Sequence, residues 1–66
     1  MRGYTKDLIA EEKSLRSRIA RLARFVNRYS SEIPADELLL LGDQLNHMVC
    51  YDKILLKRID MHMIRR

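Results

Sequence analysis

A hydrophobic repeat with alternating steps of four and three residues runs through the first half of the chain. Its first series is Leu8, Leu15, Leu22 and Tyr29, and its second is Glu12, Ile19, Val26 and Ile33. This pattern is typical of a helix that packs against another helix along one stripe. Glu12 is the one polar defect. We therefore predict a helix over residues 5–29, with Thr5 as its N-cap and Asp7 in its first turn.

The segment "SSEIP" separates this repeat from a second apolar segment. Pro34 cannot lie inside a helix but suits a first turn, and it favours an extended conformation at Ile33. We predict a turn at 30–33 and a second helix over about 34–64. Asp36 and Glu37 at its start and two arginines at its end suit the helix dipole. The expected fold is all-α, a single domain of residues 1–66 forming an antiparallel two-helix hairpin.

The second helix is too apolar to be covered by one neighbour. One seam is interrupted by Asp52, and further apolar residues lie on other sides of the helix. A 66-residue chain with one cysteine also has little core and no internal disulfide. We therefore expect a homo-oligomeric helical bundle, a dimer or higher. The residues predicted at its interface are Leu40, Leu41, Leu45, Met48, Tyr51, Ile54 and Leu55.

Positive charge is concentrated in the first half of the chain. Residues 1–30 hold eight Lys or Arg against three acidic residues, whereas residues 31–66 hold five against six. Such a half attracts nucleic acids, phosphates or acidic proteins. Arg21, Arg24 and Arg28 form one helical stripe, which is either a solvated outer face or an anion-binding surface.

The stretch "RGYTK" before the repeat allows two interpretations. Tyr4 either covers the end of the neighbouring helix or stacks on a nucleobase, as aromatic side chains do in nucleotide sites. In the second case Arg2, Lys6 or an arginine of the first helix, contributed by another copy, holds a phosphate.

The sequence shows no convincing catalytic or metal-binding motif. Asp43, His47 and Cys50 share a helix face, but structural zinc normally needs a fourth ligand. A nucleophile pair of His47 and Cys50 has no recognisable oxyanion donor. We expect no catalytic residue, no metal and no cofactor, and therefore no enzyme. The longest apolar run, "LLLL", is far too short to span a membrane, and we expect a cytoplasmic protein.

Two resemblances add to this. The segments "LIAEEKSLRSRIARLARFV" and "EIPADELLLLGDQLNHMVCYDKILLKRI" resemble the small helical proteins of crAss-phage-related bacteriophages. The start, "RGYTKDLIAEEKSLRSRIAR", is similar in "GY", "EE" and "RI" to phage anti-CBASS sponge proteins. Those proteins are short helical multimers that sequester cyclic nucleotide immune signals without cleaving them.

The sponge resemblance implies that Tyr4 stacks on a base. Where the family has a phosphate-contacting lysine this chain has Ala20, and the spacing from the tyrosine is one residue longer, so Arg18 or Arg21 would take its place. We therefore expect a phage protein that sequesters a nucleotide signal in the host cytoplasm. The alternatives are a module that inhibits a host protein and a non-specific nucleic-acid-binding protein.

Overall fold

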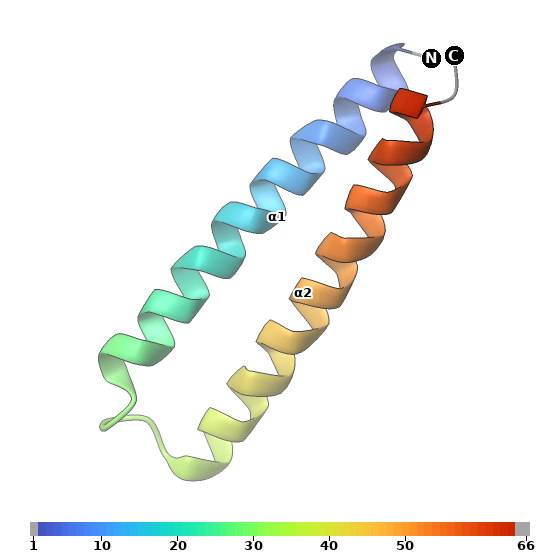
Figure 1. The fold of residues 1–66 in the computed structure, drawn as a ribbon. Helices are drawn as coiled ribbons and strands as arrows, with labels where there is room; N and C mark the ends of the chain where they lie inside the picture. Colours follow the sequence, from blue (N-terminus) through green and yellow to red (C-terminus); the bar gives the residue numbers. More distant parts are fainter. Residues whose placement is uncertain (1, 65–66) are drawn as a thin grey trace.

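Two long helices lie side by side and antiparallel (Figure 1). The computed structural model describes residues 2–64, and the side chains of Arg2 and Ile64 lie outside this description. Helix α1 is Arg2–Tyr29 and helix α2 is Ala35–Ile64. Together they form a rod of 50 × 14 × 13 Å. The predicted all-α hairpin is confirmed.

The start of α1 differs from the prediction. The helix begins at Arg2, so Thr5 lies inside it and is not its N-cap, and no acidic residue occupies its first turn. The additional turn is stabilised by contacts with the end of α2. There the ring of Tyr4 packs on His62, and its hydroxyl accepts a hydrogen bond from Arg58. Tertiary contact here outweighs the absence of a capping residue in the sequence.

The connection between the helices follows the sequence closely. The Tyr29 carbonyl accepts hydrogen bonds from the backbone N–H groups of Glu32 and Ile33, at 2.9 and 3.1 Å. These bonds satisfy the C-terminal carbonyl of α1 and reverse the chain. Pro34 precedes α2, and its carbonyl accepts a 2.9 Å bond from the N–H of Leu38. The second helix therefore begins one residue later than predicted, immediately after the proline.

The hydrophobic core is small. Leu8, Leu15 and Leu55 are buried, and the side chains packed against them are Ile19, Met48 and Ile59. Burying a leucine contributes about 1.5–3 kcal/mol. Few such residues are available to offset the conformational entropy of 66 residues, so a single hairpin is marginally stable.

The two polar interruptions of the apolar stripes meet each other inside the hairpin. Glu12 is only 2% exposed and receives two hydrogen bonds from Arg16, at 3.0 and 2.6 Å. Asp52 of α2 shares a hydrogen bond with Glu12. The Oδ1 atom of Asp52 is buried and has no hydrogen-bond partner among the described residues. The defect predicted at Glu12 is therefore paired with the interruption at Asp52.

This pairing separates the pKa values of the two acids. The Arg16 guanidinium holds the pKa of Glu12 below its ordinary value, with Asp52 and Lys13 adding to the effect against desolvation. Burial is the main cause that raises the pKa of Asp52, and the hydrogen bond and negative charge of Glu12 raise it further. When Asp52 is protonated, the proton between it and Glu12 spares the core two adjacent negative charges.

Much of the apolar surface of α2 is not covered by α1. Of the predicted interface residues, Leu40, Tyr51 and Ile54 are exposed, and Leu41, Leu45 and Met48 are half-buried towards α1. Leu55 is 0% exposed. Since its contacts are already made inside the hairpin, Leu55 cannot also contact a second copy. No helix in the described part of the chain is long and apolar enough to cross a membrane.

Candidate functional site

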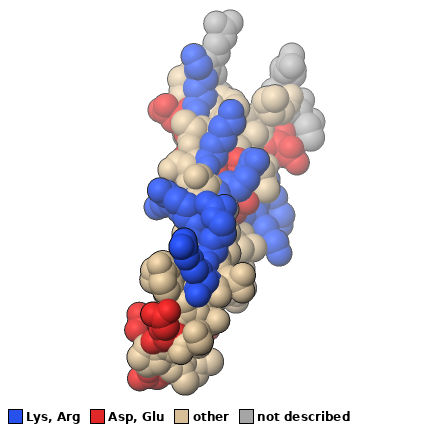
Figure 2. Space-filling view, turned by 90° about the vertical axis from the view of Figure 1, so that its left-hand side faces the viewer, with Lys and Arg blue, Asp and Glu red and all other residues tan. Residues whose placement is uncertain are grey.

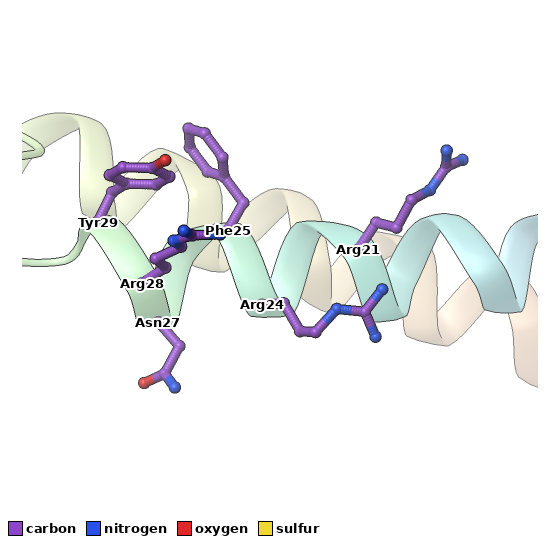
Figure 3. Close-up of a pocket in the computed structure, with 6 residues that line it drawn as sticks. All are labelled: Arg21, Arg24, Phe25, Asn27, Arg28 and Tyr29. Carbon is purple, nitrogen blue, oxygen red and sulfur yellow. The ribbon is translucent and has the colours of Figure 1, made fainter.

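A shallow pocket lies on α1 near the turn between the helices. It is lined by Arg21, Arg24, Phe25, Asn27, Arg28 and Tyr29 (Figure 3). All six residues belong to the last turns of one helix. The pocket is therefore formed by a single helix and has no wall on the side facing away from that helix. A ligand bound there would be open to solvent on that side.

Two aromatic rings and a guanidinium group form the centre of this pocket. The rings of Phe25 and Tyr29 are 5.0 Å apart at 49°, as expected for residues four apart on a helix. The guanidinium of Arg28 lies over the Tyr29 ring, 5.7 Å from its centroid. A surface that combines aromatic rings with a guanidinium group suits an aromatic ligand that carries an anionic group.

The charge around the pocket is strongly positive. Lys and Arg side chains gather on the face of α1 shown in Figure 2, while acidic groups lie towards the turn and also beside the basic groups farther from it. In the described part of the chain, the one ion pair joins Arg16 to Glu12, so Arg21, Arg24 and Arg28 have no carboxylate partner. Their charge is therefore available to an anion, and several close guanidinium groups reinforce one another.

The predicted base-stacking residue, Tyr4, lies at the opposite end of α1. Its ring is 49% exposed and meets the edge of the His62 ring, with centroids 5.0 Å apart at 77°. The Arg58 guanidinium donates a 2.5 Å hydrogen bond to the Tyr4 hydroxyl and lies 5.9 Å from the ring centroid. Tyr4 thus covers the end of α2, and half of its surface is still accessible to a ligand.

The predicted ligand residues do not meet within one hairpin. Lys6 and Arg18 are exposed. Arg21 lines the pocket. Tyr4 and Arg21 are 17 positions apart, which is about 25 Å along a helix. Arg2 lies in α1, and its side chain is outside those described. A site that uses both Tyr4 and Arg21 would therefore need more than one copy of the chain.

Sequence reasoning identified the arginine stripe but not its aromatic partners. Tyr29 belongs to the predicted apolar repeat, and Phe25, which is 48% exposed, was not predicted as part of a binding surface. The signal was the helical spacing of Arg21, Phe25 and Arg28, which places a ring between two arginines. Arg58 was also missed. Its contact with Tyr4 depends on the register of the two helices, which one sequence does not determine.

A second group of polar side chains bridges the helices beside Tyr4. The hydroxyl of Tyr51 donates a hydrogen bond to a carboxylate oxygen of Glu11. This bond, more than burial, raises the pKa of Tyr51, while the nearby charges of Arg58 and Arg18 act in the opposite direction. Tyr4, Glu11 and Arg18 recur every seven residues, so they share one face of α1 and line up beside α2.

The metal-binding interpretation gains no support from the geometry. In the part of the chain that the structure describes, no three His, Cys, Asp or Glu residues are grouped so as to hold a metal ion. Asp43, His47 and Cys50 are each exposed on α2.

Comparison with known families identifies the chain. The Sequestin family model matches residues 2–61, which is nearly the full length of the chain. The chain belongs to the Sequestin family. Comparisons with curated proteins and with solved structures give no match. The family name indicates a sequestering function.

Proposed function

We propose that this Sequestin-family protein binds a nucleotide-type signal and holds it without cleaving it. The observation that carries the proposal is the pocket that Arg21 and Arg28 line together with the rings of Phe25 and Tyr29. A nucleobase stacks on such rings with about 1–3 kcal/mol per base. The guanidinium groups bind phosphate through charge-assisted hydrogen bonds.

The residue types in the pocket favour binding over catalysis. Among the lining residues, arginine, asparagine and phenylalanine side chains do not exchange protons near neutral pH, which leaves the hydroxyl of Tyr29 as the one lining group of a general acid–base type. The biological setting proposed is a phage accessory protein that removes a cyclic nucleotide immune signal in the host cytoplasm. Sequestration of this kind is stoichiometric, because each site removes one signal molecule.

Assembly into a homo-oligomer is part of the proposal. The apolar side chains that α1 leaves uncovered extend along α2, from Leu39 to Met63. Exposed apolar surface on this scale is normally covered by a partner. A bundle of several copies also brings the ligand surfaces at the two ends of the hairpin close to each other, which one hairpin does not do.

Calorimetric titration tests the proposed function. Cyclic di- and trinucleotides and cyclic ADP-ribose isomers are titrated into protein at a concentration where light scattering shows an oligomer. We expect a binding signal with at least one of them and recovery of the nucleotide intact after release. Arg21→Ala and Phe25→Ala should each weaken binding roughly tenfold or more, since each removes a direct contact.

Lys13→Ala is the matched control. It removes one positive charge from the same helix, but Lys13 does not line the pocket. Its affinity should stay within about threefold of the wild type, because loss of one distant charge is largely screened. The absence of heat with every nucleotide would rule out the proposed function, and recovery of a cleaved product would replace sequestration with catalysis.

The uncovered face of α2 favours a second candidate, inhibition of a host protein. A stoichiometric protein captured from host lysate, together with no nucleotide binding, would support this alternative. Non-specific nucleic-acid binding, which the basic α1 face also allows, would instead show affinity that falls steeply with added salt.

A further inference from the structure

Several of the exposed apolar side chains of the hairpin lie on one face that both helices share, while Leu39, Val49, Leu56 and Met63 lie on other sides of α2. On α1 this face carries Tyr4 and Phe25, which are 49% and 48% exposed. On α2 it carries Leu40, Ile54 and Met61, which are 67%, 55% and 51% exposed. Each set recurs in steps of seven or multiples of seven, and so stays on one side of its helix. The Tyr4–Arg58 and Tyr51–Glu11 contacts join the two helices along this face. We call it the Tyr4–Ile54 face.

The two ligand surfaces lie at similar distances from the middle of the hairpin. The midpoint of α1 falls between Leu15 and Arg16. Tyr4 lies about 17 Å before it, and Phe25 and Tyr29 lie about 14 and 20 Å after it, at 1.5 Å per residue. A twofold axis that passes through this midpoint at right angles to the helices therefore places Tyr4 of one copy at the same level as Phe25 and Tyr29 of the other.

The same rotation matches the apolar residues of α2. Tyr51 lies opposite Glu11, so His47, four residues earlier, lies level with Leu15 at the midpoint. Leu40 is seven residues before His47, and Ile54 is seven residues after it. In an antiparallel pair of hairpins, Leu40 of one copy thus meets Ile54 of the other.

The charges of α2 also favour this orientation. Its first third carries Asp36, Glu37 and Asp43 and no Lys or Arg, whereas its second half carries Lys53, Lys57 and Arg58 together with two acids, the half-buried Asp52 and the exposed Asp60. Antiparallel packing sets the acidic segment of one copy beside the basic segment of the other. Parallel packing sets like charges together, which is unfavourable.

We propose that a second, antiparallel copy covers the Tyr4–Ile54 face and completes the binding pocket. Tyr4 of the partner subunit supplies the missing wall opposite Phe25 and Tyr29, and Arg58 of the partner subunit fixes its orientation through the Tyr4 hydroxyl. A flat aromatic group then lies between rings from two chains, with its anionic group on Arg21 and Arg28. The dimer has two such sites, related by its twofold axis.

This inference rests on the proposed function for its ligand, but its geometry is testable without any nucleotide. All variants carry Cys50→Ser, which removes the exposed native thiol. Leu40→Cys and Ile54→Cys proteins are mildly oxidised, separately and as a mixture, and separated by mass under non-reducing conditions. We expect a disulfide-linked species of twice the 7.9 kDa chain mass mainly in the mixture.

A second pair of variants is included because Leu40→Cys or Ile54→Cys can itself weaken assembly. Tyr4→Cys and Phe25→Cys probe the completed pocket itself and should likewise cross-link only when mixed. Efficient cross-linking of each variant alone would establish a parallel dimer and overturn the proposal. The absence of cross-linked species in both mixtures would overturn it as well. Nucleotide binding by a protein that fails these tests would leave the proposed function standing and remove only the composite site.

Discussion

At the scale of single residues, the pairing of Glu12 with Asp52 carries the most information. Each residue interrupts an apolar stripe, and each would be costly to bury alone. Together with Arg16 they form one hydrogen-bonded group that fixes the register of α1 against α2. The interruptions were visible in the sequence. Their partnership was not, because it depends on the level at which the two helices meet.

This group predicts a limited pH range of maximal stability. Folding raises the pKa of Asp52, so its proton stabilises the fold fully below the unfolded pKa, and this contribution is lost as pH rises through the folded pKa. Folding lowers the pKa of Glu12, so its contribution is present above the unfolded pKa and is lost as pH falls through the folded value. The free energy of unfolding should therefore pass through a maximum and fall both at lower pH, where Glu12 is protonated, and at higher pH, where Asp52 loses its proton.

Asp52→Asn should remove the loss of stability on the high-pH side of this profile. The asparagine amide donates a hydrogen bond to Glu12 at every pH, so we expect a gain of about 1 kcal/mol above the folded pKa of Asp52. Urea denaturation at a series of pH values and one protein concentration measures it. The control is Asp60→Asn, an exposed position on the same helix. If the free energy of unfolding of Asp52→Asn falls at high pH as much as that of the wild type, the proposed sharing of a proton between Asp52 and Glu12 is contradicted.

At the scale of the helices, the sequence predicted what local chemistry determines. The hydrophobic repeat placed the end of α1 at Tyr29, and Pro34 placed the start of α2 within one residue. The beginning of α1 was placed three residues too late, because the contacts of Tyr4 with His62 and Arg58 come from residues more than fifty positions away. Local capping rules do not include such contacts.

Gly42 provides a prediction at this scale. It lies inside α2, and a Cβ added there would meet no atom within 4 Å. Gly42→Ala should therefore stabilise the protein by about 1 kcal/mol, through helix propensity and a less flexible unfolded chain. Chemical denaturation measures the change. Gly3→Ala, equally unhindered but in the first turn of α1, should gain less. A loss of stability in Gly42→Ala would indicate that another copy packs closely on this glycine.

At the scale of the whole molecule, the sequence predicted an excess of apolar surface on α2 but not its division between core and outside. Leu55 was placed in an interface between copies and lies instead in the hairpin core. Leu40 and Ile54 lie on the exposed face. The helical period assigns residues to stripes, but only the orientation of α2 about its own axis shows which stripe faces α1.

Adjacent leucines test which exposed stripe mediates assembly. Leu39 and Leu40 are both highly exposed, at 74% and 67%, but point in different directions around α2. Leu40→Glu should place a charge in the proposed dimer interface and yield a monomer that keeps its helical circular dichroism. Leu39→Glu should leave the oligomer unchanged. Light scattering measures the mass of each, and the reverse pattern would move the interface to the Leu39 side.

Mixed dimers test the composite pocket in function. Tyr4→Ala and Arg21→Ala should each bind poorly alone, because each damages both sites of its own dimer. A mixed dimer contains one site with both changes and one with neither, so an equal mixture should regain about one quarter of the wild-type sites by random pairing. Titration with the cyclic nucleotides of the functional test measures this recovery. No recovery, with mixed dimers verified by mass spectrometry, would place each site within one chain.

The simple topology of the hairpin also determines how fast the chain folds. Most interactions in two helices joined by a short turn are local in sequence, and chains of this kind fold in microseconds to milliseconds. The chain has a single cysteine, so no disulfide within the chain delays its folding. Under the proposed function, binding capacity equals the number of assembled sites, and synthesis and association of the chains would determine how quickly it accumulates.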